Sequence, residues 1–222
     1  MKWYTYTYNN IHLGRNFISL DADSVNIDKN SFLDRLATGK FVAFKTMLID
    51  SVPVYQLHRL SKPDEAISRT ISQIAGTEIR HETLQGEKLP VYSFTDLDGR
   101  SYNEINTKGK LLVVKCWFIS CGACIAEFPE LNALVNRYKH RRDILFISLA
   151  SDGKQELQDF LKKKKFNYLV VPDMGKYMED QLQVNAYPMH LLIDKEGEIL
   201  KSTNSVHDLI PLLEEHANLS SL

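Results

Sequence analysis

Apolar runs alternate with stripes of helical spacing along most of the second half of the chain. Two runs, 111–118 and 144–150, are almost wholly apolar, which is typical of strands buried on both faces of a parallel sheet. The pattern predicts further elements around them: a hairpin at 91–102, a helix from about 121 to 138, a helix at 155–164, a strand at 168–171, a helix at 176–182, paired strands at 188–194 and 198–202, and a last helix at 206–216. Strands that alternate with helices and close in a hairpin indicate an α/β domain with a mixed sheet.

The first 85 residues have a different pattern and are predicted to form a separate, small α+β accessory domain of unknown role. The elements expected in it are an edge strand or disordered tail at 3–8, a helix at 31–37, strands at 41–44 and 47–60 with interruptions at 50–51 and Pro53, and a helix that begins at Pro63. No motif in this part points to a chemistry. Residues 86–90 are the expected linker, so the predicted domains are 1–85 and 86–222.

The sequence Cys121-Gly122-Ala123-Cys124 stands between a predicted strand and a predicted helix. This position places the first thiol at a helix N-terminus, where unpaired amides and the helix dipole favour an anion. The pKa of Cys121 is therefore expected to be low, and its exposed thiolate is the predicted attacking group. Cys124, one helical turn further on, is the predicted resolving thiol that closes the disulfide.

The alternatives to a redox pair are half of a zinc site or two structural thiols. A structural zinc site ordinarily has four ligands, commonly two such pairs or one pair with spaced histidines. The only other cysteine is Cys116, and the seven histidines show no HxxxH-type spacing. Cys116 lies on a predicted buried strand and is interpreted as an inert core thiol, with a third redox partner as the alternative.

Separated motifs resemble those of thioredoxin-fold proteins, in particular the TlpA/ResA-like family of exported thiol-disulfide oxidoreductases. Residues 115–129 resemble the active-site segment, with Trp117 four residues before the first cysteine and an E-x-P sequence at 127–129. Tyr187-Pro188 and the strand after it resemble the family's cis-proline strand. The resemblance covers about residues 86–217 and implies a thioredoxin-like fold, a mixed sheet flanked by helices and preceded by a β-hairpin.

The resemblance implies roles for three further residues. Pro188 is the expected cis-proline, which faces the cysteines and leaves the backbone of Tyr187 open to a substrate strand; a trans proline at an edge strand is the alternative. Glu127 lies three residues after Cys124 on the same helical face. It exchanges protons with Cys124 if burial raises the Glu127 pKa, and a solvated helix glutamate is the alternative.

Other residues next to the pair are expected to support it. Trp117 is predicted to pack beneath the active-site turn, and Gly122 and Ala123 to tune the thiolate, neither being the proline that thioredoxin has there. Ser120 departs from the family, in which a tryptophan often precedes the first cysteine. Its small side chain is expected to open the surface and to change substrate choice.

Two further residues, Lys115 and His190, also bear on the chemistry of the pair. Lys115 stands where thioredoxin has a buried aspartate that accepts protons. Because a lysine cannot act as that carboxylate, a different group must accept the proton, and Glu127 is the candidate. His190 follows two residues after Pro188 and is interpreted as a core or groove histidine. Copper binding is the alternative, but the resembled copper proteins have a longer gap between their cysteines and a differently placed histidine.

Charge and hydropathy restrict the partners. The 222 residues include 27 basic and 28 acidic side chains, so no charge excess is present to neutralise the phosphates of a nucleic acid. The basic run 162–165 is interpreted as the solvated end of a helix. No apolar stretch approaches the length of a membrane span, and residues 1–14 lack the apolar region of a signal peptide.

Taken literally, the sequence is therefore cytoplasmic. The resemblance instead implies an extracytoplasmic, periplasmic or membrane-anchored protein whose export segment precedes this sequence, with Met1 as an added start. It further implies disulfide-bearing protein substrates, a membrane thiol-disulfide relay as electron donor, apocytochrome maturation as one use, and no cofactor besides the redox-active disulfide.

Three functions remain open at this point. The favoured one is a thiol-disulfide oxidoreductase acting as a reductase. The second is a peroxidase on the same fold, although the PxxxTxxC signature is absent around Cys116 and Cys121. The third is a module that binds copper or a partner protein without disulfide turnover.

Overall fold

The computed structural model describes residues 2–62 and 64–219. The chain divides into two compact units, Met1–Glu82 and Thr83–Leu222. Met1, interpreted above as an added start, and Pro63, expected to open a helix, lie outside the described residues.

The first unit is built on a four-stranded sheet with the strand order β2-β1-β4-β3. Its elements are α1 (Lys2–Asn10), β1 (Ile18–Leu20), β2 (Asn26–Ile27), α2 (Lys29–Ala37), β3 (Phe41–Ile49), β4 (Val52–Arg59) and α3 (Glu65–Leu84), the last of which runs across the unit boundary. Helices α2 and α3 pack on the sheet around a core that includes Phe32, Leu33, Tyr55 and Ile71.

The expectation of an edge strand or disordered tail at residues 3–8 is wrong, because this segment forms helix α1. Its aromatic side chains Trp3 and Tyr6 pack against the core of the first unit. The Tyr6 hydroxyl also accepts a hydrogen bond from the backbone amide of Lys45 at 3.0 Å. These tertiary contacts outweigh the strand propensity of the alternating aromatic and threonine residues.

The hairpin of strands β3 and β4 corrects a second expectation. Its turn is Asp50–Ser51, where both φ angles are positive, as a type I′ hairpin turn requires. Pro53 does not interrupt β4 but pairs in register with Leu48. The pairing of β4 with β1 begins only at Val54, so a proline is tolerated at the preceding position.

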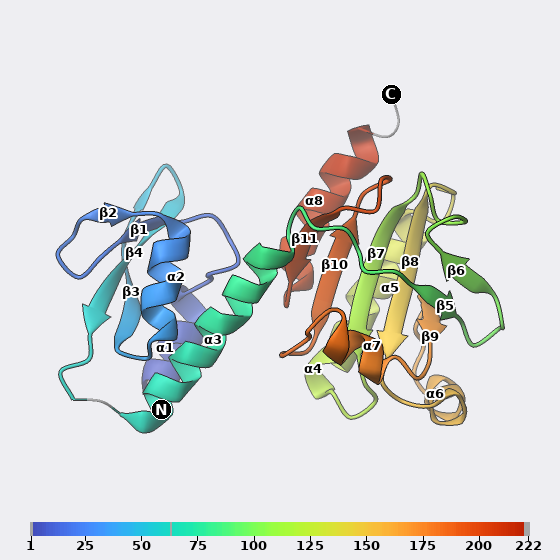
Figure 1. The fold of residues 1–222 in the computed structure, drawn as a ribbon, viewed down its shortest axis with the longest axis horizontal. Coiled ribbons are helices and arrows are strands. Elements are labelled where there is room, and N and C mark those ends of the chain that lie inside the picture. Colours follow the sequence, from blue (N-terminus) through green and yellow to red (C-terminus); the bar gives the residue numbers. More distant parts are fainter. Residues whose placement is uncertain (1, 63, 220–222) are drawn as a thin grey trace. The chain divides into compact units, whose positions relative to one another are not determined.

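The second unit contains a five-stranded sheet with the order β11-β10-β7-β8-β9 (Figure 1). Its strands are β5 (Ser93–Thr95), β6 (Ser101–Asn103), β7 (Leu111–Trp117), β8 (Ile144–Ala150), β9 (Leu169–Val171), β10 (Met189–Ile193) and β11 (Ile199–Thr203), of which β5 and β6 form a separate hairpin. Its helices, apart from the end of α3, are α4 (Gly122–Ala126), α5 (Phe128–Arg137), α6 (Lys154–Leu161), α7 (Gly175–Asp180) and α8 (Val206–Leu219). Strands β7, β8 and β9 are parallel, and β10 and β11 are antiparallel to their neighbours. The predicted α/β fold with a mixed sheet is confirmed.

Strand β7 lies at the centre of this sheet, and all seven of its residues are buried. Because side chains alternate along a strand, Val113 and Trp117 face one side and Val114 and Cys116 the other. The side of Val113 and Trp117 packs against α4, α5 and α8, and the other side packs against α7 and the β5–β6 hairpin. By this alternation, Lys115 projects toward the helices that follow the cysteine pair.

The single helix expected from about 121 to 138 is two helices, α4 and α5, joined at Glu127. Pro129 lies in the first turn of α5. A proline has no amide hydrogen and clashes with the carbonyl four residues earlier, so α4 cannot continue through it. Glu127 is consequently both the C-cap of α4 and the N-cap of α5.

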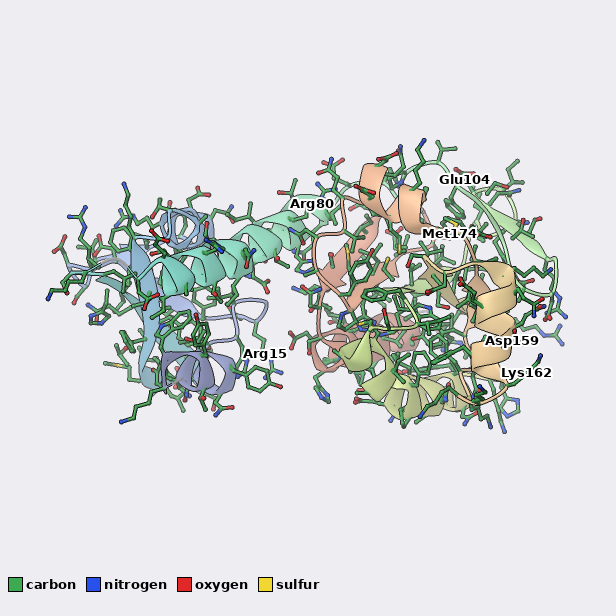
Figure 2. The ribbon with its side chains drawn as sticks, turned by 90° about the horizontal axis from the view of Figure 1, so that it is seen from below. Arg15, Arg80, Glu104, Asp159, Lys162 and Met174 are labelled. Carbon is green, nitrogen blue, oxygen red and sulfur yellow. A yellow bond between two sulfur atoms is a disulfide. The ribbon has the colours of Figure 1, made fainter. Side chains whose placement is uncertain are left out.

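The basic run at 162–165 is exposed at the end of helix α6, as predicted. Lys162 is the C-cap residue of α6 and forms a 2.7 Å ion pair with Asp159 on the same helix (Figure 2). Among the described helices, none has the length and apolar character needed to cross a membrane.

Candidate active site

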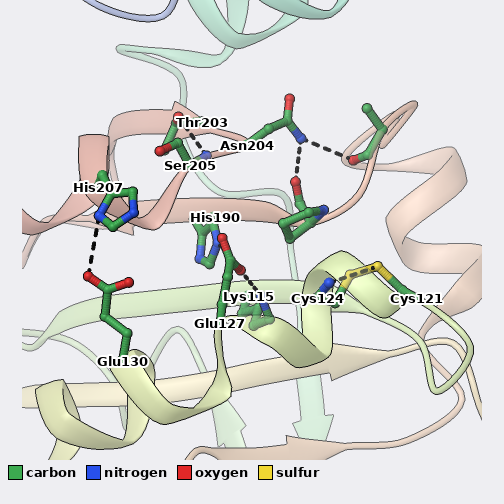
Figure 3. A network of polar contacts seen from close by, with 12 residues as sticks. Lys115, Cys121, Cys124, Glu127, Glu130, His190, Thr203, Asn204, Ser205 and His207 are labelled. Carbon is green, nitrogen blue, oxygen red and sulfur yellow. Dashed lines mark hydrogen bonds and ion pairs between the residues drawn. A yellow bond between two sulfur atoms is a disulfide. The ribbon is translucent and has the colours of Figure 1, made fainter. Parts of the chain in front are cut away.

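Cys121 and Cys124 form a disulfide at the point where strand β7 leads into helix α4 (Figure 3). Cys121 is the N-cap residue of α4, and its sulfur accepts a hydrogen bond from the backbone amide of Cys124 at 3.1 Å. After reduction, the same amide and the helix dipole favour the thiolate form of Cys121. The predicted strand–pair–helix arrangement is confirmed.

The disulfide is less exposed than expected. The exposed fraction of Cys121 is 7% and that of Cys124 is 0%, so the prediction of an exposed attacking thiol is wrong. Both cysteines belong to an apolar cluster with Trp117 and Phe128, against which Phe118, Ile119 and Tyr187 also pack. The neighbouring turn residues Ser120, Gly122 and Ala123 are exposed.

Trp117 lies beneath this turn, as expected. It is fully buried, and its ring packs at about right angles to Phe128 at 5.1 Å and to Phe166 at 5.7 Å. Asp152 holds the turn from the carboxyl end of β8, because its side chain accepts a hydrogen bond from the amide of Ile119 at 2.7 Å. Sequence reasoning missed Asp152, although parallel strands bring the ends of β7 and β8 to one edge of the sheet.

The peptide bond between Tyr187 and Pro188 is cis, as predicted. Tyr187 packs against the cluster that contains both cysteines, and its ring meets Phe118 edge-on at 5.1 Å. The side-chain amide of Asn204 donates hydrogen bonds to the carbonyls of Ala186 and Pro188 and so ties this loop to the end of β11 (Figure 3). Asn204 carried no signal in the sequence.

Three ionisable side chains, two of them fully buried, meet at the junction of helices α4 and α5. The Lys115 ammonium donates a hydrogen bond to Oε2 of Glu127 at 2.5 Å, and His190 Nε2 lies 3.0 Å from the same oxygen (Figure 3). The Lys115 and His190 side chains are fully buried, and the Glu127 side chain is 16% exposed. Glu127 is therefore not a solvated helix glutamate, and His190 is a core histidine.

Comparison with known proteins identifies the second unit. Residues 84–214, more than half of the chain, match the Redoxin family. The chain belongs to the Redoxin family. The first unit lies outside this match.

Several relatives of the Redoxin domain are named thiol-disulfide oxidoreductases, which is the activity predicted from the sequence. The thiol-disulfide oxidoreductase ResA of Bacillus cereus is 27% identical over 116 residues, which are 52% of this chain and 67% of that protein. ResA of Bacillus subtilis is 26% identical over 140 residues, 59% of this chain and 76% of that protein. The thioredoxin domain of a thiol-disulfide oxidoreductase from Bacteroides vulgatus superposes with a TM-score of 0.53 at 24% identity, covering 59% of this chain and 96% of that one, and shows the fold.

These matches confirm the resemblance to thioredoxin-fold, ResA-like proteins and the assignment to the thiol-disulfide oxidoreductases. The names of the relatives favour neither the peroxidase nor the metal-carrier alternative. Within the described part of the chain, no three histidine, cysteine, aspartate or glutamate side chains are grouped so that they could hold a metal ion.

The ionisation of Glu127 differs from the expectation. Burial in the Redoxin domain raises its pKa, but the hydrogen bonds and charges of His190 and Lys115 lower it further, so the net pKa is below its ordinary value. The condition set for Glu127, a pKa raised by burial, is not met, because the contacts with His190 and Lys115 outweigh the effect of burial. Glu127 rests as a carboxylate.

The two partners of Glu127 are shifted by burial. Burial lowers the pKa of Lys115, and the charge and hydrogen bond of Glu127 oppose this effect. Burial also lowers the pKa of His190, and the hydrogen bond that His190 makes to Glu127 opposes this effect. A neutral His190 that donates its Nε2–H to Glu127 leaves one positive and one negative charge, so the three side chains together are neutral.

Cys116 lies on the opposite face of strand β7 and is fully buried. Burial raises the pKa of its thiol to about 12. It is protonated at neutral pH, which supports the interpretation of an inert core thiol.

Proposed function

We propose that this protein reduces disulfides in exported proteins by exchanging them with the Cys121–Cys124 pair. The observation that supports this function best is the pair itself, a disulfide at a helix N-cap packed against the cis Tyr187–Pro188 segment. The roles of Cys121 as attacking thiol, Cys124 as resolving thiol and Glu127 as its proton partner belong to this proposal.

The reaction begins from the dithiol form. The Cys121 thiolate attacks one sulfur of the substrate disulfide, and the other substrate sulfur leaves as a thiolate that takes up a proton. Cys124 then gives its proton to Glu127 and attacks the sulfur of Cys121, which releases the second substrate sulfur as a thiolate that takes up this proton. The substrate gains two electrons and two protons, and Cys121 and Cys124 lose them.

The substrate is expected to lie along the cis-proline segment. Tyr187 packs against the cluster that contains the disulfide, and its backbone is the proposed partner of the substrate strand, which enters over the exposed turn at Ser120, Gly122 and Ala123. A β-carbon added at Gly122 would meet no atom within 4 Å, so this side offers room for a bound chain. The residues of the turn are proposed to tune the pair and to select substrates.

The partners and location follow from the resemblance to ResA-like proteins. Electrons are proposed to come from a membrane thiol-disulfide relay, and the protein to work outside the cytoplasm with no cofactor besides its own disulfide. Apocytochromes are one class of substrate for such a reductase.

The reduction potential of the Cys121–Cys124 pair tests the function. Samples are equilibrated in defined thiol/disulfide buffers and alkylated, and the mass shift gives the reduced fraction. A two-electron transition near about −270 mV or below is expected of a reductase, whereas one near about −120 mV would indicate a disulfide-forming oxidant. The Cys121→Ser variant is the matched control and should show no such transition. If the unmodified protein also lacked a two-electron transition, the proposal would be contradicted.

A further inference from the structure

A row of polar side chains crosses the otherwise apolar sheet beneath helices α4 and α5. Strand register aligns His190 with Thr203 on one side and with Lys115 on the other, and Lys115 with Ser148. Residues that are opposite one another in register project from the same face. All four residues are buried. Apolar side chains would fill this space without the cost of burying a charge. The polar row is therefore expected to serve the chemistry of the cysteine pair.

Glu127 connects this row to the resolving cysteine. It is the last residue of the turn that contains Cys124, and side chains three positions apart on a helix are neighbours, with β-carbons about 5–6 Å apart. The carboxylate of Glu127 at the same time accepts a hydrogen bond from the Lys115 ammonium at 2.5 Å. Figure 3 shows the three side chains in the same part of the site. The carboxylate that pairs with Lys115 therefore belongs to the residue three positions after Cys124, at the end of the same short helix.

The other ionisable groups around the ion pair are neutral or exposed. His190 faces it from β10, and burial lowers its pKa. Tyr168, which precedes β9, has a pKa raised by burial and by the charge of Glu127. The thiol of Cys116 is protonated on the far face of β7. Glu130 of α5 and His207 of α8 pair with each other at 3.3 Å at the exposed rim. Lys115 is the positive charge of the buried cluster.

We propose that Lys115 is a positioning residue for the resolving thiol, a fixed buried cation that pairs in turn with the Glu127 carboxylate and with the Cys124 thiolate. This inference rests on the proposed function and adds a role for a lysine where thioredoxin has an aspartate.

The proton transfer that this implies conserves charge. The Cys124 thiol gives its proton to the Glu127 carboxylate, so the pair Lys115⁺/Glu127⁻ becomes Lys115⁺/Cys124⁻ and no net charge is created in the interior. The Cys124 thiolate then attacks Cys121 and the Cys121–substrate bond breaks. The leaving substrate thiolate accepts a proton from Glu127, which restores the original ion pair. Without the cation, the transfer would leave an unpaired anion in a buried site.

The titration of Cys124 tests this role directly. Cys124 is studied in a Cys121→Ser background, and its alkylation rate is followed against pH by peptide mass mapping, which separates it from Cys116. Lys115→Met is expected to lower the thiolate fraction of Cys124 about tenfold at neutral pH and to move the profile to higher pH. Glu127→Gln is expected to move it to lower pH, because Cys124 becomes the anion that pairs with Lys115. Ser148→Ala, in the same row, is the matched control and should leave the profile in place.

The opposite directions separate this role from a merely structural one. Profiles of Lys115→Met and Glu127→Gln that overlay the parent, or that move in the same direction, would overturn the proposal. If Lys115→Met alone does not fold, the double variant Lys115→Met/Glu127→Gln, which has neither charge, is compared with Glu127→Gln; its profile should lie at higher pH, and coincidence of the two would overturn the proposal. The titration needs no substrate, so it fails independently of the reduction potential that tests the function itself.

Discussion

Replacing Lys115 by methionine removes one half of a buried ion pair while keeping a linear side chain of similar length. Removing one partner of such a pair typically costs about 3–5 kcal/mol, because the other charge stays buried. Glu127 is 16% exposed and remains within 3.0 Å of His190 Nε2, so partial solvation and one hydrogen bond place this variant near the lower end, about 3 kcal/mol. Glu127→Gln leaves the fully buried Lys115 ammonium without its carboxylate, which places it near the upper end, about 5 kcal/mol.

The double variant Lys115→Met/Glu127→Gln leaves neither charge. It is expected to cost less than the sum of the two single variants by about 2 kcal/mol or more, since each charge is expensive only when its partner is missing. Urea unfolding of the oxidised protein at pH 7 measures these costs. Trp117 lies in the core of the Redoxin domain, and the chain has two tryptophans, so a Trp3→Phe background makes fluorescence report on this domain.

Equal urea dependence of the unfolding free energy in all variants shows that midpoint differences report stability. If the double variant costs as much as the two single variants together, Lys115 and Glu127 do not stabilise each other in the folded protein. That result would refute both the ion pair and the proposal that Lys115 pairs in turn with Glu127 and Cys124.

Cys124→Ser is expected to accumulate a mixed disulfide between Cys121 and a substrate, whereas Cys121→Ser forms none; non-reducing mass spectrometry compares them, and equal trapping would contradict the assigned roles. The Redoxin domain is expected to lose stability as pH falls below the ordinary histidine pKa of 6.5, because burial lowers the pKa of His190 and the unfolded chain then binds a proton that the folded one excludes. His190→Asn should flatten this part of the urea midpoint measured against pH, and an unchanged slope would speak against it. Asn204→Ala removes hydrogen bonds to the carbonyls of Ala186 and Pro188 and is expected to lower kcat/KM for a disulfide substrate about tenfold with the reduction potential unchanged. An unaltered kcat/KM would show that Asn204 does not position this loop for substrate.

Local patterns in the sequence were sufficient for the central strands and the cysteine pair. The run at 144–150 is strand β8 with the predicted bounds, and Cys121 caps a helix as expected. Both signals are short-range: a buried strand is apolar on both faces, and a helix N-terminus favours a thiolate. The helix break at Glu127 was also accessible, because Pro129 forbids a continuous helix.

The cluster of Lys115, Glu127 and His190 could not be predicted from such local patterns. Lys115 and His190 are neighbours only because β10 pairs with β7 in one particular register, which no local pattern specifies. The shift of the Glu127 pKa depends on both of them. Burial alone predicts a raised pKa, whereas the two contacts make it lower than its ordinary value. The helix at residues 2–10 was missed for a related reason, since packing of Trp3 and Tyr6 decides its conformation.

The geometry of the short helix α4 determines where this active site can tolerate an inserted or deleted residue. Each residue added to an α-helix turns the following side chains by about 100° around its axis. One residue inserted between Cys124 and Glu127 would swing the carboxylate away from Lys115 and His190 while leaving the disulfide intact. A residue inserted beside Ser120, the exposed position before Cys121, would instead be absorbed at the surface. Homologous chains that keep a lysine at this strand position are therefore expected to vary in loop length ahead of the first cysteine and to keep the spacing behind the second unchanged.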